Sequence, residues 1–311
     1  MSSSGRSVPW PVALVGAGWL GRELARALHA QVGAPERDAV LATTRSGTWD
    51  GAEAPPFVDL HAWDNTRDDA ESLRDHIAGA RSMVVGWSSG GGDQDRHAVY
   101  VDGARKLLDA IDGQGIERIV YLSSTSALPA VDAWLDEDCS AWPVRERGRV
   151  QREAETLIAE TLTERSVPWV VLRLGGLYGP GRELGRLYRR DPSKPLKGDG
   201  RTPTNLIHRE DAVASVLAAL TLDPDTSCIV HAVDDDHCTR REMYDRLAQC
   251  EGLEPPRWEA EGNADVIVGK RVGNRRLKRV LGVELRHPTH LPPEPSKGAA
   301  GDAAPPLRLL D

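Results

Sequence analysis

The chain has 311 residues and a mass of 33.8 kDa, and its 39 Lys and Arg against 47 Asp and Glu give a formal net charge of −8. Such a length predicts one large domain or two closely joined ones, able to bury a full core without disulfides or metals. The acidic balance argues against a general nucleic-acid binder, which needs clustered Lys and Arg. Two basic stretches, at residues 149–152 and 275–279, are better explained as solvated helix faces.

No stretch reaches the 18 or more apolar residues that cross a bilayer. The apolar run at residues 12–20 is too short and too rich in glycine for a signal peptide. The four cysteines are scattered without a CxxC pair, which favours neither a zinc site nor a disulfide framework. We therefore expect a cytoplasmic protein, monomeric or homodimeric, with no metal and with neither membrane nor nucleic acid as partner.

Short apolar runs alternate with amphipathic segments along the first two thirds of the chain. Strands are predicted at residues 12–15, 39–43, 82–87, 119–122 and 169–174. Apolar residues at helical spacing predict helices over residues 20–28, 100–111, 150–161 and 211–220. This alternation is typical of βαβ units and predicts an α/β protein with a Rossmann-type, doubly wound parallel sheet.

Residues 16–21, Gly-Ala-Gly-Trp-Leu-Gly, fit the GxGxxG pattern between the first strand and the first helix, which is the context that a dinucleotide site requires. The first glycine allows the tight turn, and the second lets the backbone approach a pyrophosphate. The third lets helix and strand pack closely, with the phosphates at the helix N-terminus. The alternative is a glycine-rich turn without a ligand.

The end of the second strand indicates which cofactor is preferred. A site for NAD usually places Asp or Glu there, to hold the ribose hydroxyls. Residues 43–46 are instead Thr-Thr-Arg-Ser. No carboxylate repels a 2′-phosphate, and Arg45 offers several donors to bind one. NADP is therefore favoured, with NAD still possible, although Arg45 could merely stack on the adenine.

The remainder of the chain predicts a second, smaller part. Residues 178–204 are rich in Gly, Pro and Arg, and Thr239 to Glu242 has the spacing of a capping box, opening a helix that buries Met243 and Leu247. The expected organisation is a flexible N-terminus (1–10), an NAD(P)-binding domain (11–178, with 205–235 packing back onto it), a C-terminal substrate-capping lobe (179–204 and 236–290) and a proline-rich disordered tail (291–311).

Six stretches in the same order, residues 15–21, 43–46, 120–126, 172–181, 205–211 and 270–274, resemble the extended or atypical short-chain dehydrogenases/reductases of the NAD-dependent epimerase/dehydratase group. Within that group the chain is most similar to the bacterial YeeZ-like proteins, over residues 11 to about 290. The resemblance implies a Rossmann fold, an NAD(P) cofactor and a small-molecule substrate. The expected cofactor contacts are Gly16, Gly18, Trp19, Leu20, Gly21, Thr44, Arg45, Ser46, Trp87, Ser88, Ser123 and Arg173.

Members of this family commonly react through a Tyr-x-x-x-Lys pair and a Ser or Thr. The lysine lowers the pKa of the tyrosine, so that the phenol can exchange a proton with a substrate oxygen, which the Ser or Thr hydroxyl also holds. Here Arg147 and Gln151 occupy the tyrosine and lysine positions. Because arginine stays protonated, the usual acid/base pair is absent.

Four residues are candidates for the chemistry that remains. Ser124, at the end of a predicted strand, ranks first, as a hydroxyl that contacts the substrate. Tyr178 lies where the family approaches the nicotinamide, but could be a packing residue. His208 could titrate near neutral pH, or be structural or adjacent to the cofactor. Arg147 could stabilise a developing oxyanion without transferring a proton.

The leading hypothesis is an NADP-dependent oxidoreductase of the atypical type, acting on a small carbonyl, hydroxyl or imine substrate. Hydride chemistry belongs to the cofactor, so the protein needs mainly to position the substrate and stabilise charge. One alternative is a sugar-nucleotide epimerase or dehydratase, which needs an acid/base pair that is harder to find here. The other is a protein that senses NADP without turnover.

Overall fold

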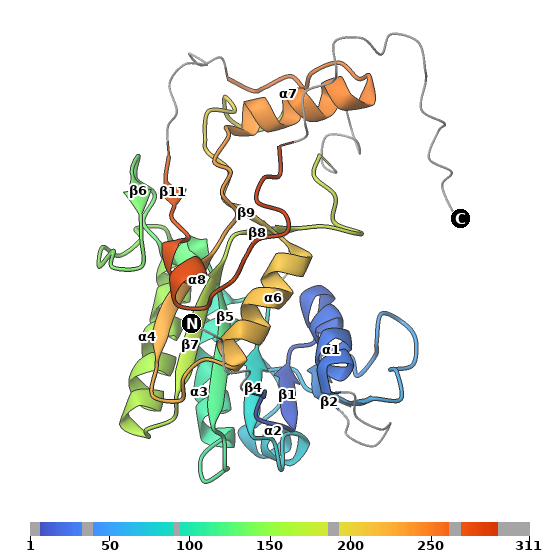
Figure 1. The fold of residues 1–311 in the computed structure, drawn as a ribbon, viewed down its shortest axis with the longest axis vertical. Helices are drawn as coiled ribbons and strands as arrows, with labels where there is room; N and C mark the ends of the chain where they lie inside the picture. The colour runs from blue at the N-terminus through green and yellow to red at the C-terminus, as the bar shows by residue number, and fades with distance from the viewer. Residues whose placement is uncertain (1–6, 33–39, 90–93, 186–192, 261–268, 292–311) are drawn as a thin grey trace.

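The computed structural model describes residues 7–32, 40–89, 94–185, 193–260 and 269–291. A central sheet of seven parallel strands has the order β10-β7-β5-β4-β1-β2-β3 (Figure 1). Its strands are β1 (Val12–Val15), β2 (Val40–Thr44), β3 (Val58–Ala62), β4 (Ser82–Val85), β5 (Arg118–Ser124), β7 (Trp169–Leu174) and β10 (Cys228–Ala232). The predicted Rossmann-type parallel sheet is confirmed.

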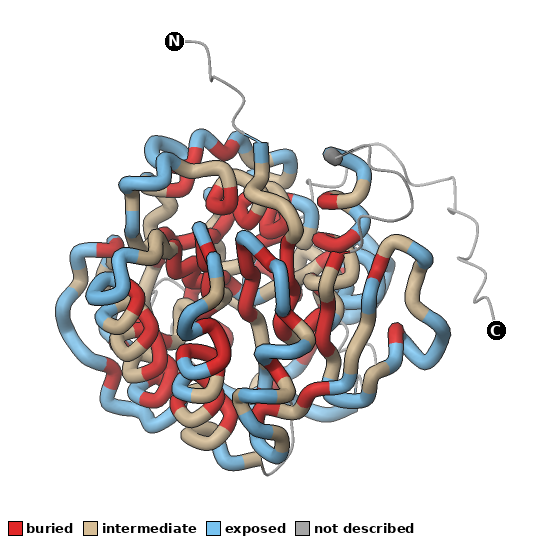
Figure 2. Tube along the Cα trace, turned by 90° about the horizontal axis from the view of Figure 1, so that it is seen from below, coloured by how far each residue is buried: buried red, intermediate tan, exposed pale blue. Residues whose placement is uncertain are grey.

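Helices cover both faces of this sheet. The first face carries α1 (Trp19–Val32), α6 (Arg209–Leu220) and the short α8 (Arg275–Arg279). The second face carries α2 (Ala70–His76), α3 (Gly103–Ala110) and α4 (Glu146–Glu164). Helix α3 directly follows the π-helical turn η1 (Ala98–Asp102). Successive residues of β1 enter opposite cores: Val12 and Leu14 pack on the first face, Ala13 and Val15 on the second. Buried residues therefore gather between sheet and helices, and exposed residues lie outside (Figure 2).

Three elements of this body, β3, α2 and β10, were not predicted from the sequence. In β3 only Val58 is buried, and the strand lies at the edge of the sheet, so it lacks the continuous apolar run of a central parallel strand. Helix α2 has seven residues, too few for a clear helical periodicity. Strand β10 begins with two half-buried residues and contains His231, which is wholly buried.

Two short two-stranded sheets lie outside the central sheet. Strand β8 (Gly176–Tyr178) pairs with β9 (Leu206–His208), and β6 (Trp134–Leu135) pairs with β11 (Arg271–Val272). Beyond them lies α7 (Arg240–Glu251), well apart from the sheet in Figure 1. Its predicted capping box is present: the Thr239 side chain accepts from the backbone N–H of Glu242, and the Glu242 side chain accepts from that of Thr239.

Helix α7 buries Met243 against Leu196 and Trp258, with Leu247 half-buried at the same cluster. The last residues of the expected capping lobe pack against the central sheet and not against α7. Leu277, Leu281 and Val283 were expected in the lobe, but they join the core on the first face of the sheet. The carboxylate of Asp211 on α6 helps to hold this segment, since it accepts from the backbone N–H groups of residues 286 and 287.

The chain ends differ in part from expectation. Trp10 packs against the core, and the carbonyl of Pro9 accepts a hydrogen bond of 2.6 Å from the Ser82 hydroxyl. The ordered body thus begins before residue 11. Residues 1–6 and 292–311 lie outside the described residues, as do residues 186–192 and 261–268 of the expected capping lobe. Among the described helices, none is both long and apolar enough to span a membrane.

Candidate functional site

Two cavities meet at the C-terminal ends of β1 and β4. The chain runs outward from β1 through β2 and β3, and then continues on the other side of β1 with β4 and β5. This reversal is where open α/β sheets bind ligands. The cavities have volumes of about 380 and 660 Å³. Both are lined by Gly16, Gly18, Gly86, Trp87 and Ser88. One elongated ligand can therefore run from the smaller cavity into the larger.

The glycine loop has the geometry of a dinucleotide cradle. Gly16 has φ +91°, and a Cβ there would lie 2.2 Å from the carbonyl oxygen of Gly86, so a larger residue would displace backbone. A Cβ on Gly18 would meet nothing within 4 Å, which leaves room for a ligand to approach the backbone. A Cβ on Gly21 would lie 3.4 Å from the Cβ of Ala17. The loop and the joined cavities fit a dinucleotide cofactor such as NAD(P).

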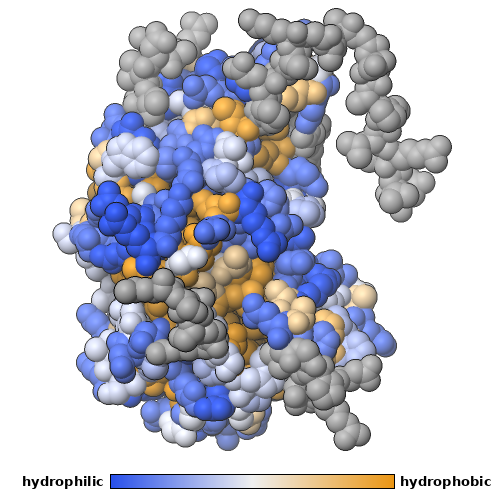
Figure 3. Space-filling model, in the orientation of Figure 1, coloured by the Kyte–Doolittle hydropathy of each residue, from blue (hydrophilic) through white to orange (hydrophobic). Residues whose placement is uncertain are grey.

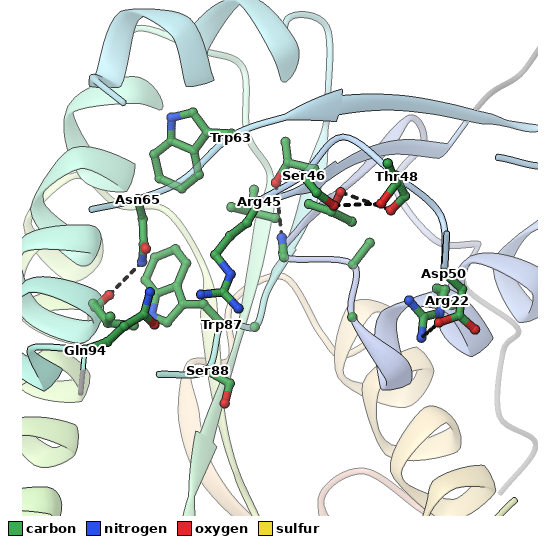
Figure 4. Close-up of a pocket in the computed structure, with 18 of the residues that line it drawn as sticks. Arg22, Arg45, Ser46, Thr48, Asp50, Trp63, Asn65, Trp87, Ser88 and Gln94 are labelled. Atoms are coloured by element: carbon green, nitrogen blue, oxygen red, sulfur yellow. Dashed lines mark hydrogen bonds and ion pairs between the residues drawn. The ribbon is translucent and has the colours of Figure 1, made fainter. Parts of the chain in front are cut away.

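The smaller cavity, of about 380 Å³, carries two guanidinium groups. Figure 4 shows Arg45 reaching across it toward Trp87 and Ser88. Arg22 lies at the opposite side, paired with Asp50 at 3.1 Å. The sequence analysis did not select Arg22, although it follows the last glycine of the motif directly. Two cations at the expected ribose end favour an anionic group there.

Thr44 and Ser46, the other expected contacts from this strand end, line the same cavity. Both hydroxyls are tied to Thr48: the Thr44 hydroxyl donates to the Thr48 carbonyl at 3.3 Å, and the Ser46 and Thr48 hydroxyls lie 2.7 Å apart. These bonds shape the turn after β2 and so set the direction in which Arg45 leaves the strand.

Trp19 and Leu20, the first residues of α1 and two of the expected cofactor contacts, line the larger cavity. The indole Nε1 of Trp19 donates to the carbonyl of Pro180 at 3.1 Å. The guanidinium carbon of Arg182 lies 4.6 Å from the centre of the same indole, and that of Arg209 lies 4.9 Å from it. This stack joins the glycine loop to the segment after β8.

Ser124 and Arg147 line the larger cavity together, although they come from different elements. Ser124 ends β5, and its hydroxyl accepts from the backbone N–H of Ser126 at 3.1 Å, capping the 3-10 turn η2 (Thr125–Ala127). Arg147 is exposed in the first turn of α4. The sequence analysis did not select Lys270, which also lines this cavity. Its only sequence signal is that it begins the last of the six matching stretches.

The expected contact of Arg173 with the cofactor is wrong. Its side chain is fully buried and lines neither cavity. Its Nε lies 3.0 and 3.1 Å from the two carboxylate oxygens of Glu155, and its Nη2 donates to Glu155 at 2.8 Å. Ser123 does line the larger cavity, but its hydroxyl donates to the same carboxylate. Arg173 thus stabilises the wall behind the site and does not touch a ligand.

His231 extends this buried network on β10. Arg173 Nη1 lies 3.3 Å from His231 Nε2, and His231 Nδ1 lies 3.2 Å from the carbonyl of Gly273. A neutral ring with its proton on Nδ1 satisfies both contacts, because Nε2 then accepts from the guanidinium. Burial, with a smaller contribution from the nearby positive charge of Arg276, lowers the pKa of His231 to about 4.

We expect this histidine to make the protein less stable in acid. The unfolded chain takes up the proton near pH 6.5, but the folded chain does so only near pH 4. Above pH 6.5 the neutral His231 ring contributes about 3 kcal/mol to the free energy of unfolding. This contribution is lost as the pH falls toward 4. Urea unfolding of the wild type and of His231→Asn from pH 7 to pH 4 measures it. The difference between their unfolding free energies should shrink by that amount, and parallel curves would contradict the assignment.

Tyr178 and His208 lie outside the residues that line the two cavities. Their rings pack edge to face at 5.1 Å, and Tyr178 also meets His290 at 6.2 Å. Nδ1 of His208 caps α6 by accepting from the backbone N–H of Glu210. Burial raises the pKa of Tyr178, so the phenol keeps its proton at neutral pH. The structure therefore does not bring all four candidate catalytic residues together: only Ser124 and Arg147 share a cavity.

A family model described as NAD(P)H-binding matches residues 16–224. The chain belongs to this NAD(P)H-binding family. Protein YeeZ of Escherichia coli (strain K12) is 30% identical over 288 residues, which cover 90% of this chain and 97% of YeeZ. The predicted resemblance to YeeZ-like proteins is thus confirmed. The 2′-dehydrokanamycin reductase of Streptomyces kanamyceticus is 27% identical over 164 residues, 47% of each chain.

A solved structure of the dTDP-glucose 4,6-dehydratase DesIV from Streptomyces venezuelae, with NAD bound, has a TM-score of 0.74 to this chain. It is 19% identical, and the match covers 89% of this chain and 92% of that one. At this identity the likeness shows the fold. The Rossmann fold predicted for this chain is thereby confirmed.

Proposed function

We propose that the protein is an NADP-dependent oxidoreductase acting on a small carbonyl, hydroxyl or imine compound. One observation carries the proposal: the glycine cradle opens into a cavity that both Ser124 and Arg147 line. That is the pair of groups needed to hold a substrate oxygen and stabilise negative charge on it. The similarity to a reductase across 47% of the chain supports the same chemistry.

The proposal of NADP over NAD rests on the smaller cavity. Arg45 and Arg22 lie on two sides of the end that would hold the adenine ribose, and of the described residues lining this cavity only Asp50 is acidic. Asp50 is already paired with Arg22. A 2′-phosphate would find Arg45 within reach and no unpaired carboxylate among these residues to repel it.

In the proposed reaction, bound NADPH would supply the hydride, and the protein would orient the substrate oxygen. The Ser124 hydroxyl would donate a hydrogen bond to that oxygen, and Arg147 would stabilise charge that develops on it. The lobe around α7, with residues 193–204 and 236–258, would enclose the substrate from the side away from the sheet.

Replacing Ser124 with alanine tests this function. The change removes a hydrogen bond to the substrate oxygen, worth about 0.5–1.5 kcal/mol in a neutral pair and more to a developing charge. We expect turnover of NADPH with a responsive carbonyl compound to fall roughly tenfold or more. NADPH affinity should stay close to that of the wild type, because Ser124 is not among the residues that line the smaller cavity.

Ser124→Thr is the matched control, since it keeps both the hydroxyl and the cap of η2. It should retain most of the turnover. Unchanged turnover in Ser124→Ala would remove this hydroxyl from the mechanism. If the wild type binds NADPH but oxidises it with no carbonyl, ketoacid or imine in a broad panel, the oxidoreductase proposal fails and a cofactor-sensing role is favoured.

A further inference from the structure

The larger cavity, of about 660 Å³, lacks the family's usual proton donor, but it has another group that can exchange a proton near neutral pH. Of the described residues that line it, none is an acid, a histidine or a cysteine. Arg147 and Arg182 stay protonated. The hydroxyl of Tyr100 accepts from the backbone of Ser89, next to the junction of the two cavities. Lys270 supplies the one amine among the described residues of this lining.

Lys270 is held at both its backbone and its ammonium group. The Asn205 side chain donates to the carbonyl of Lys270 at 3.0 Å and accepts from the backbone N–H of Val272 at 2.8 Å. The Nζ of Lys270 donates to the carbonyls of Thr125 and Leu128, at 2.7 and 2.9 Å. It therefore lies against the turn that begins with Ser124.

Two carbonyl acceptors leave the third proton of this ammonium for a ligand in the cavity. No carboxylate pairs with Nζ among the described residues. Gln151, at the family's lysine position, turns instead toward Ser123 and Tyr121, with its Nε2 3.1 and 3.4 Å from their hydroxyl oxygens. The lysine of this cavity is thus Lys270, more than 100 residues after the family's lysine position at Gln151.

We propose that Lys270 is the catalytic acid/base of this protein, donating a proton to the substrate oxygen that Ser124 holds. The inference rests on the proposed oxidoreductase function. In reduction the substrate carbon gains the hydride, the cofactor is oxidised to NADP⁺, and the substrate oxygen gains one proton from Nζ. Lys270 is left as a neutral amine and regains its proton from water. In oxidation the neutral amine accepts the hydroxyl proton.

The electrostatic surroundings suit this role. Burial lowers the pKa of Lys270 to about 8, where a group can both give and take a proton at working pH. The Arg145 charge contributes to this lowering of the pKa, whereas Cys139 acts in the opposite direction. Two other groups complete these surroundings: Arg147, which lines the same cavity, is a fixed cation, and His231, on β10, is neutral above about pH 4.

The first test follows the lysine itself. The chain has six lysines, so reductive methylation with ¹³C-formaldehyde gives few NMR signals, and Lys270→Arg identifies one of them. We expect the Lys270 signal to titrate near pH 8 and to move when NADP⁺ binds. Lys278, on α8, pairs with Asp235 and lines neither cavity. Its signal should not move when NADP⁺ binds, so it serves as the control. A Lys270 signal that titrates above pH 10, or ignores bound NADP⁺, overturns the proposal.

The second test is the pH profile of NADPH oxidation with a carbonyl compound on which the wild type is active. Reduction by the wild type should fall about tenfold per pH unit above pH 8, because the acid form is lost. Lys270→Arg keeps the positive charge, and its guanidinium can donate to both carbonyls. We expect its kcat to fall about 10²-fold and the decline above pH 8 to disappear, while NADPH affinity stays unchanged. Lys278→Arg should behave as wild type.

The outcomes separate the two proposals. Failure to bind NADPH, or the absence of turnover across the panel, contradicts the oxidoreductase function, whatever Lys270 does. Turnover that survives Lys270→Arg with an unchanged pH profile contradicts only the role of Lys270 and leaves it as a structural contact of the turn after β5.

Discussion

Arg173→Leu should destabilise the protein by about 3–5 kcal/mol, because it leaves a buried carboxylate without its main partner. Glu155 is 2% exposed and receives three contacts of 2.8–3.1 Å from Arg173. After the change, the Ser123 hydroxyl and the more distant Arg152, at 3.6 Å, would be the partners that the described residues still offer that carboxylate. Urea unfolding at pH 7 measures the loss through the transition midpoint at an unchanged slope.

The double variant Arg173→Leu/Glu155→Leu is the control. Replacing both charges with apolar groups removes the orphaned carboxylate, so it should recover much of the lost stability. NADPH affinity of the folded variants should stay near that of the wild type, since Arg173 lines neither cavity. A loss below about 1 kcal/mol in the single variant, or a selective loss of cofactor binding, would show that the side chain acts differently.

Arg45→Asp should weaken NADPH binding by about 10- to 100-fold and leave NADH binding nearly unchanged. The change removes a charge-assisted contact, worth about 1.5–3 kcal/mol, and adds a negative charge beside the 2′-phosphate. Arg45 is exposed in the smaller cavity and points across it, so the change should disturb no buried contact (Figure 4). Isothermal titration calorimetry with both cofactors measures the two affinities.

Arg26→Asp is a matched control for net charge. Arg26 is exposed on α1, pairs with Glu23 at 3.2 Å and lines neither cavity. It should leave both affinities close to wild type, apart from a small effect that salt screens. Equal losses for NADPH and NADH in Arg45→Asp would mean that Arg45 stacks on the adenine and does not bind the 2′-phosphate.

The surface of the molecule sets the context for these tests. Hydrophilic residues cover most of the face shown in Figure 3, and hydrophobic residues appear in a band between its upper and lower parts. The Arg45→Asp change is made at an exposed side chain, whereas changes at Arg173 act in the interior.

What the sequence by itself determined is the part of the protein built from local patterns. The glycine loop, the buried strands and the main helices follow from residues within a few positions of one another, because a turn or a helix face is decided at that range. The Thr239 to Glu242 capping box was predictable for the same reason. Both the Rossmann fold and the cradle at Gly16 and Gly18 therefore followed from the sequence.

Only the tertiary structure decided which polar side chains face the cavity. Arg173 and Ser124 belong to neighbouring strand ends. Arg173 nevertheless turns inward, because its partners Glu155 on α4 and His231 on β10 are buried there. Lys270 bonds to a carbonyl 145 residues earlier in the chain, a contact that no local pattern can encode. The direction of a polar side chain depends on partners brought by distant segments, since a buried charge is stable only where its counter-charge or hydrogen-bonding groups are already in place.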